Sequence, residues 1–131
     1  MKTIALAIVK NLKEEVLIIK RRKVEKGSGD AKLTYAFPGG TVEDEEKTTA
    51  TAVREAKEET GYTVIARNII SERNHPQFPV RVVYVVCQLS SEDHSQPDDE
   101  EVVEVLWVAV LKLSEYFTTD LDPKVAYYLG I

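Results

Sequence analysis

The feature that most constrains the fold is a single helical segment, residues 48–60, set between blocks rich in valine and isoleucine. Within this segment Ala52, Val53 and Ala56 recur at helical spacing on one face. Gly61 follows directly, and glycine is a common residue at a helix end. Because β-branched residues pack well on a pleated sheet, the blocks on both sides predict strands. One helix that covers a sheet indicates an α/β or α+β fold.

The blocks rich in valine and isoleucine divide into short extended segments with turn signals between them. Residues 3–10 and 15–22 predict a hairpin, because a polar stretch separates two aliphatic runs. The polar segment 23–33 contains glycine and predicts a loop. A short extended piece is expected on each side of the Pro-Gly-Gly turn at 38–40, since proline lacks a backbone donor and glycine permits unusual backbone angles. Later strands are predicted at 62–72, 80–89 and 101–110.

The last third of the chain contains an acidic loop, residues 90–101, and a short closing helix. Asp122 before Pro123 is typical of a helix start, because the aspartate accepts from free backbone N–H groups and proline suits the first turn. These elements predict a mixed β-sheet of five to seven strands with one central and one terminal helix. A chain of 131 residues can bury a core of its own, so we expect one domain, 1–131.

Composition limits the class of protein. The 17 basic and 22 acidic residues give a net charge of -5, which disfavours nucleic acid as the main partner. The one cysteine, Cys87, lies in an apolar run and predicts a buried thiol in a reducing compartment. The N-terminus does not have the pattern of a signal peptide, and no apolar run approaches the roughly 20 residues of a membrane span. We therefore expect a cytoplasmic protein that binds neither nucleic acid nor membrane.

The helical segment concentrates acid in a chain that is already acidic. Glu55, Glu58 and Glu59 lie at i, i+3 and i+4, so their carboxylates project from one face of the helix. A magnesium ion would offset their repulsion, since it binds oxygen ligands and bridges carboxylates to phosphates. This pattern favours phosphoryl or pyrophosphoryl transfer. The alternative is a solvated helix face, because Arg54 and Glu58 form an i, i+4 pair that supports an exposed helix.

The spacing of a longer set of residues decides between these two interpretations. Gly40 is followed after five positions by Glu46, and after seven more by the run REAKEETGY at 54–62. This order resembles the Nudix box, G-x5-E-x7-R-E-U-x-E-E-x-G-U with U aliphatic, and all seven invariant letters are present. Chance agreement is expected in roughly one in 10⁶ such chains. The lead-in YAFPGG, the acidic stretch before Trp107 and the closing helix are also similar to the family.

Three positions depart from the family pattern. Ala56 stands where a larger aliphatic residue is usual, and Tyr62 replaces the final aliphatic residue of the box. Lys47 occupies a position where the family often has a serine or threonine helix cap, so Thr48 or Thr49 would have to serve instead. The first two positions concern packing of the helix, not metal binding.

The resemblance implies a fold, a reaction and roles for the residues of the box. The implied fold is a Nudix-type α/β/α sandwich with a mixed sheet, and the implied reaction is hydrolysis of a phosphoric anhydride bond. Glu55, Glu58 and Glu59 match the family's metal ligands, with magnesium as the cofactor and manganese as a substitute. Arg54 is expected to orient one of these glutamates, and Glu46 to be the partner of Arg54.

Further candidates lie around the box. Gly40 is expected to offer a backbone carbonyl to the metal, and Glu101 and Glu104 are additional candidate ligands. The general base is open between a box glutamate and one of these two acids. Candidates for substrate binding are Arg21, Arg22, Phe37 and His75. The alternatives are a solvated strand end for the arginines, core packing for the phenylalanine or for Tyr35, and no role for the histidine.

Three functions are compatible with the resemblance. The leading prediction is cleavage of a nucleoside triphosphate, including an oxidised one, to a monophosphate and pyrophosphate, because sugar-nucleotide members often carry an additional N-terminal domain. The runner-up is ADP-ribose or another nucleotide sugar. Members of that subgroup tend to have a proline after the box, and Pro76 lies 14 residues after Tyr62. The third is a non-catalytic nucleotide-sensing module, whose mark is a degenerate box. We expect a monomer or a homodimer.

Overall fold

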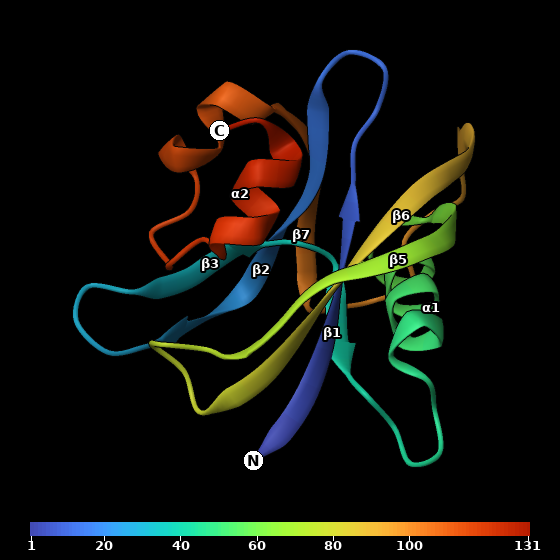
Figure 1. Cartoon of the computed structure of the whole chain (residues 1–131). Coiled ribbons are helices and arrows are strands. Elements are labelled where there is room, and N and C mark those ends of the chain that lie inside the picture. The colour runs from blue at the N-terminus through green and yellow to red at the C-terminus, as the bar shows by residue number, and fades with distance from the viewer.

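Two β-sheets form the interior of the protein in a computed structural model that describes residues 1–131 (Figure 1). The first sheet has the order β4-β1-β6-β5, with bounds Gly39–Thr41, Lys2–Val9, Val80–His94 and Tyr62–Asn74. The second has the order β3-β2-β7, with bounds Lys32–Ala36, Glu15–Lys26 and Val102–Ala109. The helices are α1, α2 and the 3₁₀ helix η1, with bounds Thr48–Thr60, Pro123–Leu129 and Val110–Glu115. Only β1 and β6 pair in parallel.

The pair β1 and β6 forms the centre of the first sheet and is buried on both faces. Residues 82–87 of β6 are all buried, which explains why this part of the sequence is continuously apolar rather than alternating. On one face Ala5 and Ala7 belong to the core under α1, and on the other Ile8 and Tyr84 belong to the core under α2. The two helices therefore lie on opposite sides of the strands (Figure 1). The predicted mixed α+β fold is confirmed.

The predicted hairpin of residues 3–10 and 15–22 is wrong. Only the bridge between Lys10 and Val16 joins the two segments, whereas β1 pairs with β4 and β6 and β2 pairs with β3 and β7. Strands that are adjacent in sequence often pair, but not always. Here β1 pairs with β6 along its whole length, from Lys2 to Val9, and Ala5, Ala7, Ile8 and Val9 are buried in this arrangement; the local turn sequence does not encode such a long-range pairing.

Two strands are longer than the sequence predicts. β2 continues to Lys26, inside the predicted loop 23–33, and pairs there with Lys32 of β3. β6 continues to His94, inside the predicted acidic loop 90–101, where it pairs with Tyr62. Both extensions are exposed, so their side chains carry no apolar signal, although the ladder satisfies their backbone groups. The short helix η1 was not predicted.

The helix ends show one prediction confirmed and one wrong. Asp122 caps α2 as predicted, since its side chain accepts from the N–H groups of Lys124 and Val125. At α1 the N-cap residue is Lys47, and neither Thr48 nor Thr49 supplies a side-chain capping bond. The chain before α1 is instead held at Glu46, which accepts hydrogen bonds from Thr51 and Arg54 of the helix.

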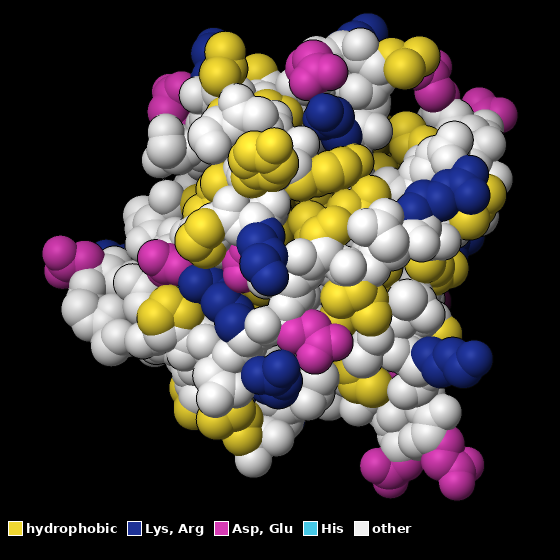
Figure 2. Space-filling view, viewed as in Figure 1, with side chains coloured by type: hydrophobic (Ala, Val, Ile, Leu, Met, Phe, Trp, Pro, Cys, Tyr) yellow, Lys and Arg dark blue, Asp and Glu magenta, His cyan; other side chains and the backbone are white.

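The surface around α2 is more apolar than its surroundings. On the face shown in Figure 2, apolar side chains gather around α2, and lysine, arginine and acidic side chains are dispersed around them. Tyr127 of this helix is 87% exposed. None of the helices combines the length and the hydropathy that crossing a bilayer requires. Cys87 is buried and unpaired, as predicted.

Candidate functional site

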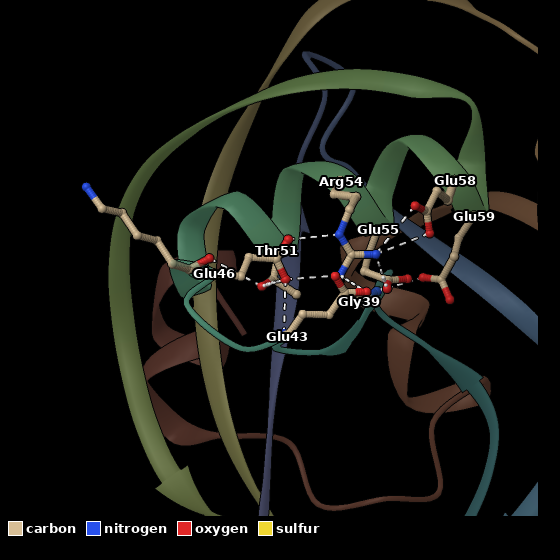
Figure 3. Close-up of polar contacts among 9 residues, drawn as sticks. Gly39, Glu43, Glu46, Thr51, Arg54, Glu55, Glu58 and Glu59 are labelled. Atoms are coloured by element: carbon tan, nitrogen blue, oxygen red, sulfur yellow. Dashed lines mark hydrogen bonds and ion pairs between the residues drawn. The ribbon is translucent and has the colours of Figure 1, made fainter.

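Arg54 of α1 holds carboxylates on both sides of its side chain (Figure 3). Its Nε and Nη2 donate to the two oxygens of Glu46, at 2.8 and 3.0 Å. Its Nη1 donates to Glu55 at 2.9 Å and more weakly to Glu58 at 3.4 Å. The Thr51 hydroxyl adds a bond of 2.6 Å to Glu46. Because the guanidinium and the hydroxyl donate to it, the pKa of Glu46 falls to about 2. Glu46 is therefore an ionised partner of Arg54.

Three carboxylates meet beyond this network. Glu55 and Glu59 come from successive turns of α1, Asp99 comes from the loop before β7, and one oxygen from each lies within 4.8 Å of the others. The N–H of Gly39 donates to Glu59 at 2.7 Å. Burial raises the pKa of Glu55 and raises that of Glu59 to about 8. We call these three residues the carboxylate cluster.

The carboxylate cluster fits a divalent cation. Carboxylate oxygens are the ligands that magnesium, manganese and calcium prefer. Burial penalises the charged forms of Glu55 and Glu59, which raises their pKa values, and a bound cation would offset this penalty. A Cβ atom at Gly40 would lie 2.7 Å from the Glu55 carboxyl carbon, so a side chain at this position would displace the carboxylate from its present place. The residues present could therefore hold magnesium or manganese.

The other acids predicted as metal ligands are not members of this cluster. Glu58 is partly exposed, and its carboxylate faces Arg54 instead of the cluster. Glu101 lines the same cavity as the cluster. Glu104 lines a separate cavity on β7, so the structure does not bring it to the cluster. Sequence reasoning missed Asp99, which lies in the predicted acidic loop; the local sequence contains no signal that singles it out from its acidic neighbours.

A cavity of about 350 Å³ lies beside the carboxylate cluster and is lined by strands of both sheets. Glu55, Glu59 and Asp99 contribute to its wall. Aromatic side chains contribute as well, and these are Tyr35, Phe37, Phe78, Tyr84 and Phe117. The cavity thus combines carboxylates that could bind a cation with an apolar surface on which a planar ligand group could pack. This is the usual composition of a small-molecule site.

The two arginines predicted to bind substrate have different positions. Arg21 lines the cavity and forms an ion pair of 2.9 Å with Glu25. Arg22 does not line it. Its Nε instead donates to the carbonyl of Glu100 at 2.7 Å, which ties β2 to the loop that carries Asp99.

Phe37 and His75 both line the cavity. Phe37 is only 4% exposed and packs edge-on against Phe117, with ring centroids 4.9 Å apart, so core packing accounts for most of its surface. The N–H of Gln77 donates to Nδ1 of His75 at 3.0 Å. Burial lowers the pKa of His75, which favours the neutral ring with its proton on Nε2. His75 therefore has one N–H donor to offer.

The fold and the carboxylate-lined cavity fit a hydrolase of phosphoric anhydride bonds, and comparison with known proteins establishes this class. The NUDIX domain model matches residues 1–128. The chain belongs to the Nudix hydrolase family, whose enzymes act on nucleotide substrates and generally use a divalent metal. The predicted family is thus confirmed.

Three solved structures illustrate the shared fold. A Nudix hydrolase from Nitrosomonas europaea has a TM-score of 0.74 at 17% identity, covering 98% of this chain and 89% of that chain. An ADP-ribose pyrophosphatase from Streptococcus suis has a TM-score of 0.70 at 19% identity, and the match covers 98% of this chain and 90% of that chain. A MutT protein from Methanosarcina mazei has a TM-score of 0.66 at 24% identity, and the match covers 98% of this chain and 88% of that chain. No curated protein matches. At these identities the likeness concerns the fold and does not transfer a substrate.

Proposed function

We propose that this protein is a magnesium-dependent pyrophosphohydrolase that converts a nucleoside triphosphate, including an oxidised one, into a monophosphate and pyrophosphate. Manganese is the expected substitute. The observation that carries the proposal is the shared cavity, in which the carboxylate cluster and the aromatic side chains face one hollow. Its volume of about 350 Å³ lies at the lower end of the range for ligand sites, roughly 300–1,000 Å³.

The roles of the box residues follow from their contacts. Glu55, Glu59 and Asp99 are proposed to hold the cation, which when bound neutralises charge that develops on the phosphate oxygens. Arg54 is proposed to orient Glu55 through their bond of 2.9 Å, while the two bonds to Glu46 keep the guanidinium in place.

The remaining acids are given supporting roles. Glu58 is proposed as an additional ligand that would turn from Arg54 toward the cation, since its bond to Arg54 is long, 3.4 Å, and its carboxylate is partly exposed. Gly40 is proposed to make room for Glu55 and to offer its carbonyl. Glu101 is the proposed general base, since it lines the cavity outside the cluster. It takes a proton from water; the water oxygen bonds to phosphorus, and the anhydride oxygen leaves with the other phosphate.

Substrate contacts are proposed for Arg21 and His75. Arg21 lines the cavity and carries a charge that phosphate oxygens attract. His75 is proposed to donate from Nε2 to an acceptor on the base or sugar, because its other ring nitrogen already accepts from the backbone. Phe37 is proposed to form the apolar wall, with Tyr35, which is less buried, as the better surface for stacking.

ADP-ribose is the second candidate substrate. The turn between β5 and β6 contains Pro76, and its neighbours His75 and Phe78 line the cavity. A structure of the same fold is named an ADP-ribose pyrophosphatase. However, ADP-ribose carries a second ribose beyond the diphosphate, and the cavity lies near the lower end of the volume range for ligand sites. We therefore place the triphosphate first.

A substrate panel tests the proposal. The full chain is incubated with magnesium and either a nucleoside triphosphate, its oxidised form, ADP-ribose or a nucleotide sugar, and the products are separated by chromatography. We expect pyrophosphate and a monophosphate from a triphosphate. Preference for ADP-ribose would overturn the triphosphate assignment. Binding without turnover of any compound, unchanged in Glu59→Gln, would instead support a nucleotide-sensing module; Asp44→Asn, at an exposed acid before α1, is the control.

A further inference from the structure

Asp99 comes from outside the box, so the loop between β6 and β7 must be held in the right place. Two backbone hydrogen bonds fasten this loop to the C-terminal end of α1. The N–H of Ser95 donates to the carbonyl of Gly61 at 3.0 Å, and the N–H of Asp98 donates to the carbonyl of Glu58 at 2.7 Å. We call this pair of bonds the loop latch. Its second bond comes from the residue directly before Asp99.

Gly61 is in direct contact with the loop. Its φ of 79° is left-handed, as suits a helix end. A Cβ atom at Gly61 would lie only 1.9 Å from the carbonyl oxygen of Ser95 and 2.8 Å from its carbonyl carbon, so any side chain would push the loop away. Gly130 ends α2 with a similar φ of 86°, yet a Cβ atom there would meet nothing within 4 Å. Ending a helix thus requires the backbone angle, whereas Gly61 must also lack a side chain.

We propose that Gly61 is a positioning residue for Asp99. The missing side chain of Gly61 lets the loop latch form, and the latch carries Asp99 to Glu55 and Glu59. The proposal rests on the proposed function, because it takes Asp99 as the third ligand of the cation. It also links Gly61 of the box to Asp99, which lies far along the chain. The carboxylate cluster is complete only when the loop that carries Asp99 lies against α1.

Matched asparagine substitutions test this role. Asparagine is among the residues that best tolerate left-handed φ, so Gly61→Asn and Gly130→Asn differ mainly in the contact with Ser95. The dissociation constant of Mn²⁺ is measured on the full chain without nucleotide, by electron paramagnetic resonance of the free ion. We expect Gly61→Asn to weaken Mn²⁺ binding by about 10- to 100-fold, as for other residues that orient metal ligands. Gly130→Asn should bind Mn²⁺ as the wild type does.

A double variant shows whether Gly61 acts through Asp99. Asp99→Asn should weaken Mn²⁺ binding about as much as Gly61→Asn, and the combined variant should bind no more weakly than Asp99→Asn alone. Additive losses would overturn the proposal, since independent effects add. Wild-type affinity in Gly61→Asn beside a weakened Asp99→Asn would overturn it too. If Asp99→Asn binds normally while Glu59→Gln does not, the inference fails but the cation site stands; if neither variant loses affinity, the proposed function itself fails.

A variant on the loop side keeps the test decisive if Gly61→Asn does not fold. Ser95→Pro removes the donor of one bond of the loop latch and adds no side chain at Gly61. Ser95 is exposed, so the far-UV circular dichroism spectrum should be that of the wild type. Weaker Mn²⁺ binding in this folded variant would support the proposal, and unchanged binding would overturn it.

Discussion

Glu59 is a carboxylate in a place that is costly for a charge. It is 8% exposed, and Glu55 and Asp99 lie close to it. One N–H donor, from Gly39, partly offsets the burial that raises its pKa to about 8. Arg54 bonds to Glu55 but not to Glu59, so the guanidinium does not remove the cost. A buried charge of this kind is retained where a cation completes the site.

Glu59→Gln is expected to stabilise the cation-free protein at pH 8 by a few kcal/mol. The pKa of Glu59 is about 8 in the folded protein against an ordinary value of 4.5. Between these values the folded state binds more protons than the unfolded state, so the free energy of unfolding falls as pH rises. Glutamine keeps an acceptor for Gly39 and has no charge to bury.

Urea unfolding in a chelator, from about pH 5 to about pH 9, checks this expectation. The wild type should lose stability across the range and Glu59→Gln much less. Glu58→Gln is the control, because that carboxylate is partly exposed and should change stability little. An equal pH dependence in Glu59→Gln and the wild type would contradict the expectation.

The helix that presents these carboxylates, α1, packs on the sheet through a small residue that lies beside a large one. Ala56 and Tyr62, the two packing departures from the family pattern, belong to the same core cluster. Ala56 is small and Tyr62 is large, and Trp107 packs against the cluster that contains both. The indole N–H of Trp107 donates to the Tyr62 hydroxyl at 3.0 Å, so this phenol has a partner. The departures thus affect packing and leave the carboxylates in place.

Ala56→Leu is expected to lower the free energy of unfolding by about 1–3 kcal/mol, because Ala56 is fully buried and the added methylenes have no space. Ala50→Leu is the control on the same helix, since Ala50 is exposed and should shift stability by about 0.5 kcal/mol or less. Urea unfolding of both variants distinguishes the two. Similar small shifts would show that the core beside Tyr62 has room for a larger residue.

Across the molecule, the site joins parts that are far apart in the chain. The cavity is lined by strands of both sheets, by α1 and by the loop that carries Asp99. A ligand bound there contacts all of these parts only in the folded protein. Binding must therefore favour the folded state, by an amount set by ligand concentration and affinity.

Magnesium and a non-hydrolysable triphosphate analogue are expected to raise the melting temperature together. A ligand at 100 times its Kd adds about 2.7 kcal/mol to the free energy of unfolding. The rise with magnesium should be reversed by a chelator and should be smaller in Asp99→Asn. Differential scanning fluorimetry measures both effects. A larger rise with ADP-ribose than with the analogue would favour the second candidate substrate.

Local features account for the parts that were predicted correctly. The helix 48–60 was expected with the bounds that α1 has, because Gly61 ends it and its apolar residues recur with helical period. Asp122 was expected to cap α2, since capping involves only neighbouring residues. Strand pairing was not foreseen: the partner of β1 lies more than 70 residues away, as the register of Leu6 with Tyr84 shows.

The same division holds for the site. That Glu55 and Glu59 share a face of one helix follows from the sequence, because i, i+4 geometry is local and rigid; the spacing of the box likewise identified the family. The pair of Arg54 with Glu58 is local in the same way, whereas the choice of Asp99 over Glu104 for the carboxylate cluster depends on the tertiary structure. The reason is physical: a loop acid is selected by where the loop docks, and that depends on contacts across the whole fold, among them the one at Gly61.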